Sequence, residues 1–305
     1  MRKSIFGPIG LICVMFVWAF GWNCASAQQK LVAERPIEHI VNLEIQGSGG
    51  LLKPGATILI GEFHGTWETP ILIASIVRQA ATLNVETILC IECCASEQAS
   101  IDCFLNSEGH NMSIDNLLGS PHWSNQDGRA SVGIFGMLEL LRRLRHDGKM
   151  IQVVAMDSNW ESPSVDPATL TREELRRLEE LTAGRDLAMS KSVIQTRKQS
   201  PNAIVIAFAG DVHTRMIKGT SWDAEYIPMG WYVSQEVKDV VSLITETAGG
   251  KAWIQTDRGI GPTTIGGKNR GETPFVELFD APQLGYHGFF YVGKITVAKP
   301  AKDGG

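Results

Sequence analysis

Two largely apolar runs most constrain how this chain can fold. They cover about residues 56–61 and 203–209, and neither shows the alternation of polar and apolar residues that a half-exposed strand requires. Such runs are typical of strands buried on both faces of a parallel sheet. Each ends in a Gly-x-x-His sequence, which places His64 after the first run and His213 after the second. Because parallel strands end at one edge of a sheet, we expect the two imidazoles to share a crevice there.

The remaining pattern alternates strands and helices up to about residue 215 and is mostly strands beyond it. It predicts an α/β fold whose central sheet is mostly parallel, flanked by helices and extended by antiparallel C-terminal strands. Residues 28–305 would form one domain, with its core at about 56–215 and the C-terminal strands at 216–300. Further core strands are expected at 86–92 and 150–156, helices at 70–83, 131–146 and 171–198, and late strands at 231–234, 240–244, 252–255 and 289–297.

Two local features add to this outline. Thr69 and Pro70 are typical of a helix start, with threonine as the capping residue. Residues 95–128 are polar and rich in turn-forming residues, so we interpret them as an irregular insertion, a possible lid over the strand ends.

Composition limits the kind of protein this can be. The 305 residues are 44% hydrophobic and carry a net charge of −5, without a basic cluster. This suits a globular protein with a sizeable core and argues against nucleic-acid binding. The sequence leaves the oligomeric state open.

The first 27 residues resemble an export signal. Arg2 and Lys3 precede an apolar stretch at 9–20 that is short for a membrane span, and Ala25-Ser26-Ala27 fits a cleavage site. We therefore expect a periplasmic or secreted protein that begins at Gln28 and keeps no stable membrane span. A lipoprotein attached at Cys24 or an uncleaved anchor are the weaker alternatives.

Four cysteines would remain after cleavage, all in one short segment. In an oxidising compartment, a disulfide between Cys103 and either Cys93 or Cys94 is the expected outcome, with Cys90 as a buried thiol. A zinc cluster is disfavoured because Cys93 and Cys94 are adjacent and no second Cys-x-x-Cys pair follows.

Polar residues gather at the predicted strand ends. Two imidazoles and several carboxylates there suit either of two kinds of site. His64, Glu92 and His213 could hold a divalent metal ion, or a carboxylate could orient an imidazole that activates water without metal. The strand-end residues are Glu62, His64, Glu92, Asp157, Asp211 and His213.

Each of these residues also has a structural interpretation. Glu62 and Glu92 could simply cap helices or form ion pairs. Arg185 could pair with a site carboxylate or a developing oxyanion, but Arg185-Asp186 could equally be a structural pair. We assign no role to the other histidines, although His122 could line the crevice by its location. They are His39, His110, His122, His146 and His287.

Four segments within about residues 56–215 carry a family resemblance. They are Gly61-Glu62-Phe63-His64-Gly65-Thr66-Trp67-Glu68, then Glu92, then Arg185-Asp186-Leu187-Ala188-Met189, then Gly210-Asp211-Val212-His213. Together they resemble the superfamily of erythromycin esterases, ChaN-type haem-binding lipoproteins and Tiki/TraB metal-dependent peptidases. The chain differs from the erythromycin esterases by one residue fewer between Glu62 and the histidine. The extra cysteines and the insertion at 95–128 also have no match.

The resemblance implies roles for His64, Glu62, Glu92, Arg185 and His213. Two functions follow as alternatives. The first is an exported hydrolase, an esterase, lactonase or peptidase acting on a small molecule or peptide, with or without a divalent metal. In it, His64 would be a general base that titrates near neutral pH. The second is a haem or iron carrier without turnover, in which a histidine ligates the iron.

Overall fold

The structure is a computed structural model that describes residues 42–158, 171, 173, 184–256 and 259–302. The expected export signal and much of the expected helix at 171–198 lie outside these residues.

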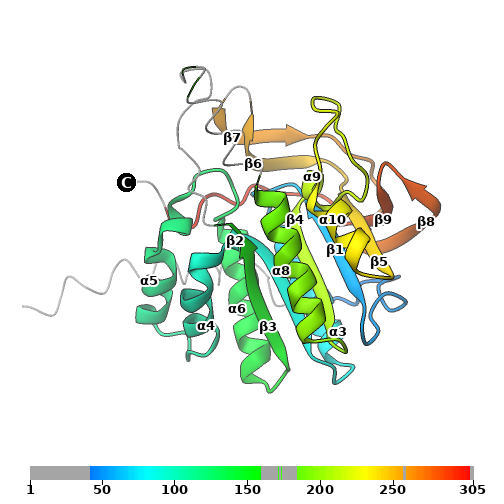
Figure 1. Cartoon of the computed structure of the whole chain (residues 1–305). Coiled ribbons are helices and arrows are strands. Elements are labelled where there is room, and N and C mark those ends of the chain that lie inside the picture. Colours follow the sequence, from blue (N-terminus) through cyan, green and yellow to red (C-terminus); the bar gives the residue numbers. More distant parts are fainter. Residues whose placement is uncertain (1–41, 159–170, 172, 174–183, 257–258, 303–305) are drawn as a thin grey trace, which may run out of the picture. The chain divides into compact units, whose positions relative to one another are not determined.

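Seven strands form the central sheet, in the order β3-β2-β4-β1-β5-β9-β8 (Figure 1). Every neighbouring pair is parallel except β8 and β9. The predicted mostly parallel α/β sheet is therefore confirmed. The strands are β1 (Thr57–Glu62), β2 (Thr87–Cys94), β3 (Ile151–Asp157), β4 (Ile204–Gly210), β5 (Val240–Glu246), β8 (Phe275–Gln283) and β9 (Tyr286–Tyr291).

The two apolar runs that define the fold are the neighbouring strands β1 and β4. Both are buried along their whole length, and their register pairs Glu62 with Gly210. The Gly-x-x-His sequences that follow them therefore begin side by side at the same edge of the sheet.

The C-terminal strands are only partly antiparallel. β6 (Gly250–Thr256) and β7 (Gly259–Ile265) form a separate antiparallel pair, and β8 pairs antiparallel with β9. β5 and β9, however, extend the central sheet in the parallel sense. Figure 1 shows β6 and β7 lying across the edge where the parallel strands end.

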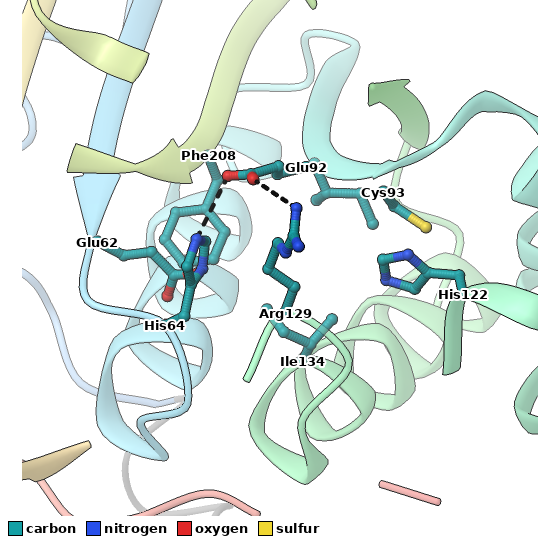
Figure 2. A pocket seen from close by; sticks show the side chains of 9 residues that line it. Glu62, His64, Glu92, Cys93, His122, Arg129, Ile134 and Phe208 are labelled. Atoms are coloured by element: carbon teal, nitrogen blue, oxygen red, sulfur yellow. Dashed lines mark hydrogen bonds and ion pairs between the residues drawn. The ribbon is translucent and has the colours of Figure 1, made fainter. Parts of the chain in front are cut away.

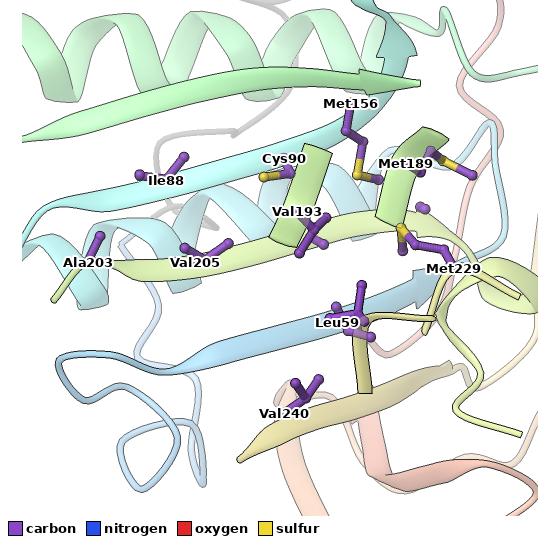
Figure 3. Packing of buried hydrophobic residues seen from close by; sticks show 13 residues of the cluster. Leu59, Ile88, Cys90, Met156, Met189, Val193, Ala203, Val205, Met229 and Val240 are labelled. Carbon is purple, nitrogen blue, oxygen red and sulfur yellow. The ribbon is translucent and has the colours of Figure 1, made fainter. Parts of the chain in front are cut away.

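Helices cover the sheet and bury its apolar side chains. α8 (Arg185–Gln199) and α10 (Met229–Glu236) contribute Met189, Val193, Met229 and Val233 to a cluster with residues of β1, β2 and β4 (Figure 3). α3 (Glu68–Ala81) and α6 (Val132–His146) pack against each other. In the part of the chain that the structure describes, no helix is long and apolar enough to cross a bilayer.

Three local predictions were wrong. Residues 231–234 belong to helix α10, because Met229 and Val233, one turn apart, are both buried in the core. The aromatic residues between them, which favoured a strand, are only partly buried. Helix α3 begins at Glu68, slightly before Thr69. α8 begins at Arg185, inside the range 171–198 that was expected to be a single helix with Arg185 near its middle.

The segment at 95–128 is also more regular than expected. Its helices are separated by turns that the polar and glycine residues form, which explains why no long periodic pattern was visible. The helical elements are η1 (Ala95–Glu97), α4 (Gln98–Leu105), α5 (Asn111–Gly119) and η2 (Pro121–Ser124).

The four cysteines among the described residues are all free thiols, so the expected disulfide is not seen. Cys93 is buried at the end of β2, whereas Cys103 lies on the exposed side of α4. Burial raises the pKa of Cys90 to about 12, as expected for an inert thiol in the core.

Candidate active site

The first histidine of the site is held by the last residue of β1. His64 Nδ1 lies 2.9 Å from Glu62 Oε1, a hydrogen bond that directs Nε2 toward Glu92 Oε2, 3.6 Å away. The turn continues through Gly65 at a φ of 64°, where a Cβ atom would clash with the carbonyl of Trp253. The tight turn that presents His64 therefore depends on glycine at this position.

The second histidine is held in the same way from a different part of the chain. His213 lies in the short helix α9 (Asp211–Thr214) after β4, and its Nδ1 is 2.9 Å from Asp186 Oδ1. Asp186 also accepts hydrogen bonds from the Tyr226 hydroxyl at 2.7 Å and the Met229 backbone N–H at 2.7 Å. His213 Nε2 then faces Glu92 Oε1 at 3.8 Å.

Glu92 lies between the two imidazoles. Its carboxylate accepts hydrogen bonds from Arg185 Nη2 at 2.6 Å and from the Gly210 backbone N–H at 2.8 Å. Arg185 is fixed in turn by Asp157 at the end of β3, with Nε to Oδ2 at 3.0 Å. Strand-end residues of β2, β3 and β4 thus cooperate to hold one buried carboxylate in place.

A second guanidinium group reaches this carboxylate from the segment before α6. Arg129 Nη1 lies 3.6 Å from Glu92 Oε1, and its Nε donates to Asp127 Oδ2 at 2.9 Å. Figure 2 shows its side chain extending toward Glu92, with His64 on one side and His122 on the other.

These contacts decide the charges of the site. Burial alone would lower the pKa of His64, but the Glu92 charge and the hydrogen bond to Glu62 outweigh it and raise the pKa to about 9. The pKa of His213 is likewise raised, because Glu92 and Asp186 oppose the effect of burial. Burial would raise the pKa of Glu92, yet the surrounding cations hold it well below its ordinary value. At neutral pH His64 is therefore an imidazolium group beside the Glu92 carboxylate, and the same anion favours the protonated form of His213.

A crevice connects this cluster to the segment at 95–128. Its volume is about 10 Å³, which is near the least that can hold one ordered water molecule. The lining residues are Glu62, His64, Ile91, Glu92, Cys93, His122, Arg129, Ile134 and Phe208 (Figure 2).

The cofactors considered from the sequence fit this arrangement poorly. Both Nδ1 atoms already bind carboxylates, and Glu92 is engaged by a guanidinium group that would repel a divalent cation. Among the described residues, no group of three or more histidine, cysteine or carboxylate side chains is arranged to hold a metal ion. Haem needs a wide apolar surface, which a crevice of this size and charge does not offer.

The structure brings together the residues singled out from the sequence. Glu92 contacts His64, Arg185 and His213 directly, and Glu62 joins the group through His64. Their catalytic roles remain predictions. The strand-end residue Asp157 joins them through Arg185.

Two other polar residues near the strand ends bind partners other than the site histidines. Asp211 accepts a hydrogen bond from the Val212 N–H at the start of α9, and Glu68 binds Thr296. Arg185 binds Glu92 and Asp157, whereas Asp186 binds His213 on the other side of the site. Four further residues of the site were not predicted, and only the place of Asp186 in the Arg185–Met189 motif could have indicated one of them. They are Asp127, Arg129, Asp186 as the partner of His213, and Tyr226.

Comparison with known proteins identifies the fold. No protein-family model and no curated protein sequence matches the chain. A mutant of the erythromycin esterase EreC in its open conformation superimposes with a TM-score of 0.60 and 12% identity, over 83% of this chain and 94% of that one. A Bacillus cereus protein superimposes with a TM-score of 0.55 and 13% identity, over 92% of this chain and 99% of that one. The haem-binding ChaN of Campylobacter jejuni has a TM-score of 0.36 and 15% identity, over 65% of this chain and 84% of that one. This similarity is too distant to bear on function.

These similarities show the fold at very low sequence identity. The chain is an α/β protein with the fold of the erythromycin esterases, as the sequence motifs implied. Its particular activity has to be argued from its own site.

Proposed function

We propose that this protein is a hydrolase that adds water to an ester, lactone or peptide carbonyl and that His64 activates the water. One observation carries the proposal. Two imidazoles, each held at Nδ1 by a buried carboxylate, converge on Glu92 at the edge of the sheet where α/β proteins bind ligands. A carboxylate-held imidazole beside a crevice is the arrangement that general acid–base catalysis uses.

In this proposal His64 removes the proton from water. The bond to Glu62 keeps the hydrogen of neutral His64 on Nδ1, so Nε2 carries the lone pair. Nε2 and Glu92 Oε2 lie 3.6 Å apart, which allows one water molecule to bind both from the side. As the water oxygen bonds to the carbonyl carbon, its proton moves to Nε2, and the two glutamates stabilise the resulting imidazolium.

The remaining residues act on the charge that develops on the substrate. Arg129 supplies a cation in the crevice for the oxyanion. His213, whose protonated form Glu92 and Asp186 favour, donates a proton to the leaving group as the tetrahedral intermediate collapses. Arg185 keeps Glu92 oriented between the two histidines.

The pH dependence of the reaction follows from this assignment. Sequence reasoning placed the pKa of His64 near neutrality, but the contacts of Glu62 and Glu92 raise it to about 9. Only the neutral imidazole accepts a proton, so kcat/KM should rise with pH up to about 9. The carboxylates around His64 explain why its pKa lies above the value expected from the sequence.

A substrate screen with matched variants tests the proposal. The purified protein is offered activated esters, lactones and peptides, and the best substrate is used to compare His64→Ala with His110→Ala. The control histidine is exposed at the start of α5. We expect His64→Ala to lose roughly 10²- to 10⁴-fold in kcat and the control to lose none.

His64→Gln separates a base from a metal ligand. If activity is lost while the metal content of the purified protein stays the same, His64 acts as the base. Joint loss of bound metal and activity would support a metal-dependent reaction instead. Full activity of His64→Ala would refute the proposed function.

A further inference from the structure

His122 lies in the crevice but has no part in the proposed water activation. It belongs to η2, and its side chain is buried, with only 5% of the residue exposed. Its backbone N–H donates to Glu97 Oε1 at 3.3 Å, and its ring meets Trp123 edge-on with centroids 5.8 Å apart. Trp123 in turn packs edge-on against Phe135 of α6. The imidazole is therefore held rigidly in one orientation.

One ring nitrogen of this histidine is left without a partner. His122 Nδ1 is buried and makes no hydrogen bond with the residues that the structure describes. Buried polar atoms are nearly always paired, so an orphan atom in a residue that lines a crevice points to a partner that a bound group would supply. Figure 2 shows the ring extending into the crevice from the side opposite His64.

The surroundings of His122 define which group it can bind. Burial and the nearby Arg129 cation lower the pKa of His122 to about 4, so the ring is neutral at neutral pH. A neutral imidazole has one donor and one acceptor nitrogen, and a hydroxyl group can satisfy either of them. His122 lines the same crevice as His64, so a substrate bound at His64 can place a hydroxyl group against the ring. A carboxylate in this position would favour a charged imidazole ring. An ammonium group would be repelled by the Arg129 cation.

We infer that His122 is a specificity residue that binds a hydroxyl group of the substrate, at the end of the crevice away from His64. This inference rests on the proposed hydrolase function. It narrows the substrate to esters or related acyl compounds that carry a hydroxyl group a few bonds from the carbonyl.

The test compares p-nitrophenyl hexanoate with the set of its monohydroxylated derivatives. For at least one derivative, wild-type kcat/KM should exceed that of the plain ester by about tenfold, the value of one hydrogen bond. His122→Phe keeps a ring but has no nitrogen, so the ratio of kcat/KM for the hydroxylated ester to kcat/KM for the plain ester should fall to about one, whatever the absolute rates. His122→Asn places an amide near the Nδ1 position and should retain part of the preference, and His110→Phe should retain all of it.

The outcomes separate this inference from the proposed function. A hydroxyl preference that survives His122→Phe, or no preference in the wild-type protein, refutes the inference and leaves the hydrolase assignment standing. If the wild-type protein hydrolyses none of these esters or the screened substrates, the proposed function fails. The dissociation constants of the same esters then test His122 alone: tighter binding of a hydroxylated ester that His122→Phe abolishes supports it, and equal affinities refute it.

Discussion

The charged state of His64 can be measured without any substrate, because it links stability to pH. The unfolded chain releases the proton of a histidine near pH 6.5, whereas folded His64 holds it until about pH 9. Its contribution to the free energy of unfolding is therefore complete below pH 6.5. It is lost as the pH rises through about 9.

The size of this effect follows from the shift itself. A pKa raised from 6.5 to about 9 corresponds to at most about 3 kcal/mol of stability. The side chain of His64 is 23% exposed, so solvent screening reduces the measured value below this limit. Between the two pKa values the free energy of unfolding should fall by about 1.4 kcal/mol per pH unit for each such histidine. His213, whose pKa is also raised, adds to the fall.

A different histidine limits stability on the acid side. The pKa of His122 is lowered to about 4, so the unfolded chain binds a proton there between pH 6.5 and 4 that the folded protein excludes. Stability should therefore decrease in that range as the pH falls. Together the two effects place the maximum near pH 6.5.

Urea unfolding at a series of pH values tests this reasoning in wild type, His64→Gln and His110→Gln. Wild type and the exposed control should lose stability with the same slope between about pH 6.5 and 9. The slope of His64→Gln should be shallower by about 1.4 kcal/mol per pH unit in that range. Equal slopes in wild type and His64→Gln would show that folded His64 is neutral, and the assigned charges of the site would be wrong.

Three further predictions concern other parts of the molecule. Glu62→Gln removes the anion beside His64 Nδ1, which lowers the pKa of His64 and should move the pH profile of hydrolysis to lower pH. An unchanged profile would exclude this electrostatic role of Glu62. Gly128→Ala, whose Cβ would clash with the Trp253 carbonyl, should destabilise the protein by at least about 1 kcal/mol more in thermal unfolding than Gly148→Ala. Both glycines have positive φ, but nothing lies near Gly148, so equal losses would dismiss the close contact. Mass spectrometry of the exported protein should find Gln28 as its first residue, and an intact N-terminal methionine would contradict export with cleavage.

The parallel core of this protein could be derived from the sequence because of where its strands lie. β1 and β4 are covered on both faces, so nearly every position must be apolar and the runs stand out without any knowledge of their partners. Their ends were equally visible, because a glycine and a polar residue interrupt the apolar run. Glu62, His64 and His213 were therefore identified from local sequence alone, as was Glu92 at the end of β2.

Only the tertiary structure decided how these residues are paired. Asp186 and His213 are separated by 27 residues, and Glu92 and Arg185 by 93, so no local pattern connects them. The same holds for α10, where the burial of Met229 and Val233 against α8 overrides the strand preference of the aromatic residues between them. It holds for Arg129, in the turn before α6, and for His122, in the short helix η2, which both reach the crevice only because the chain folds back over the strand ends. Local sequence determines which side chains leave a buried strand, whereas long-range packing determines which charges they meet there.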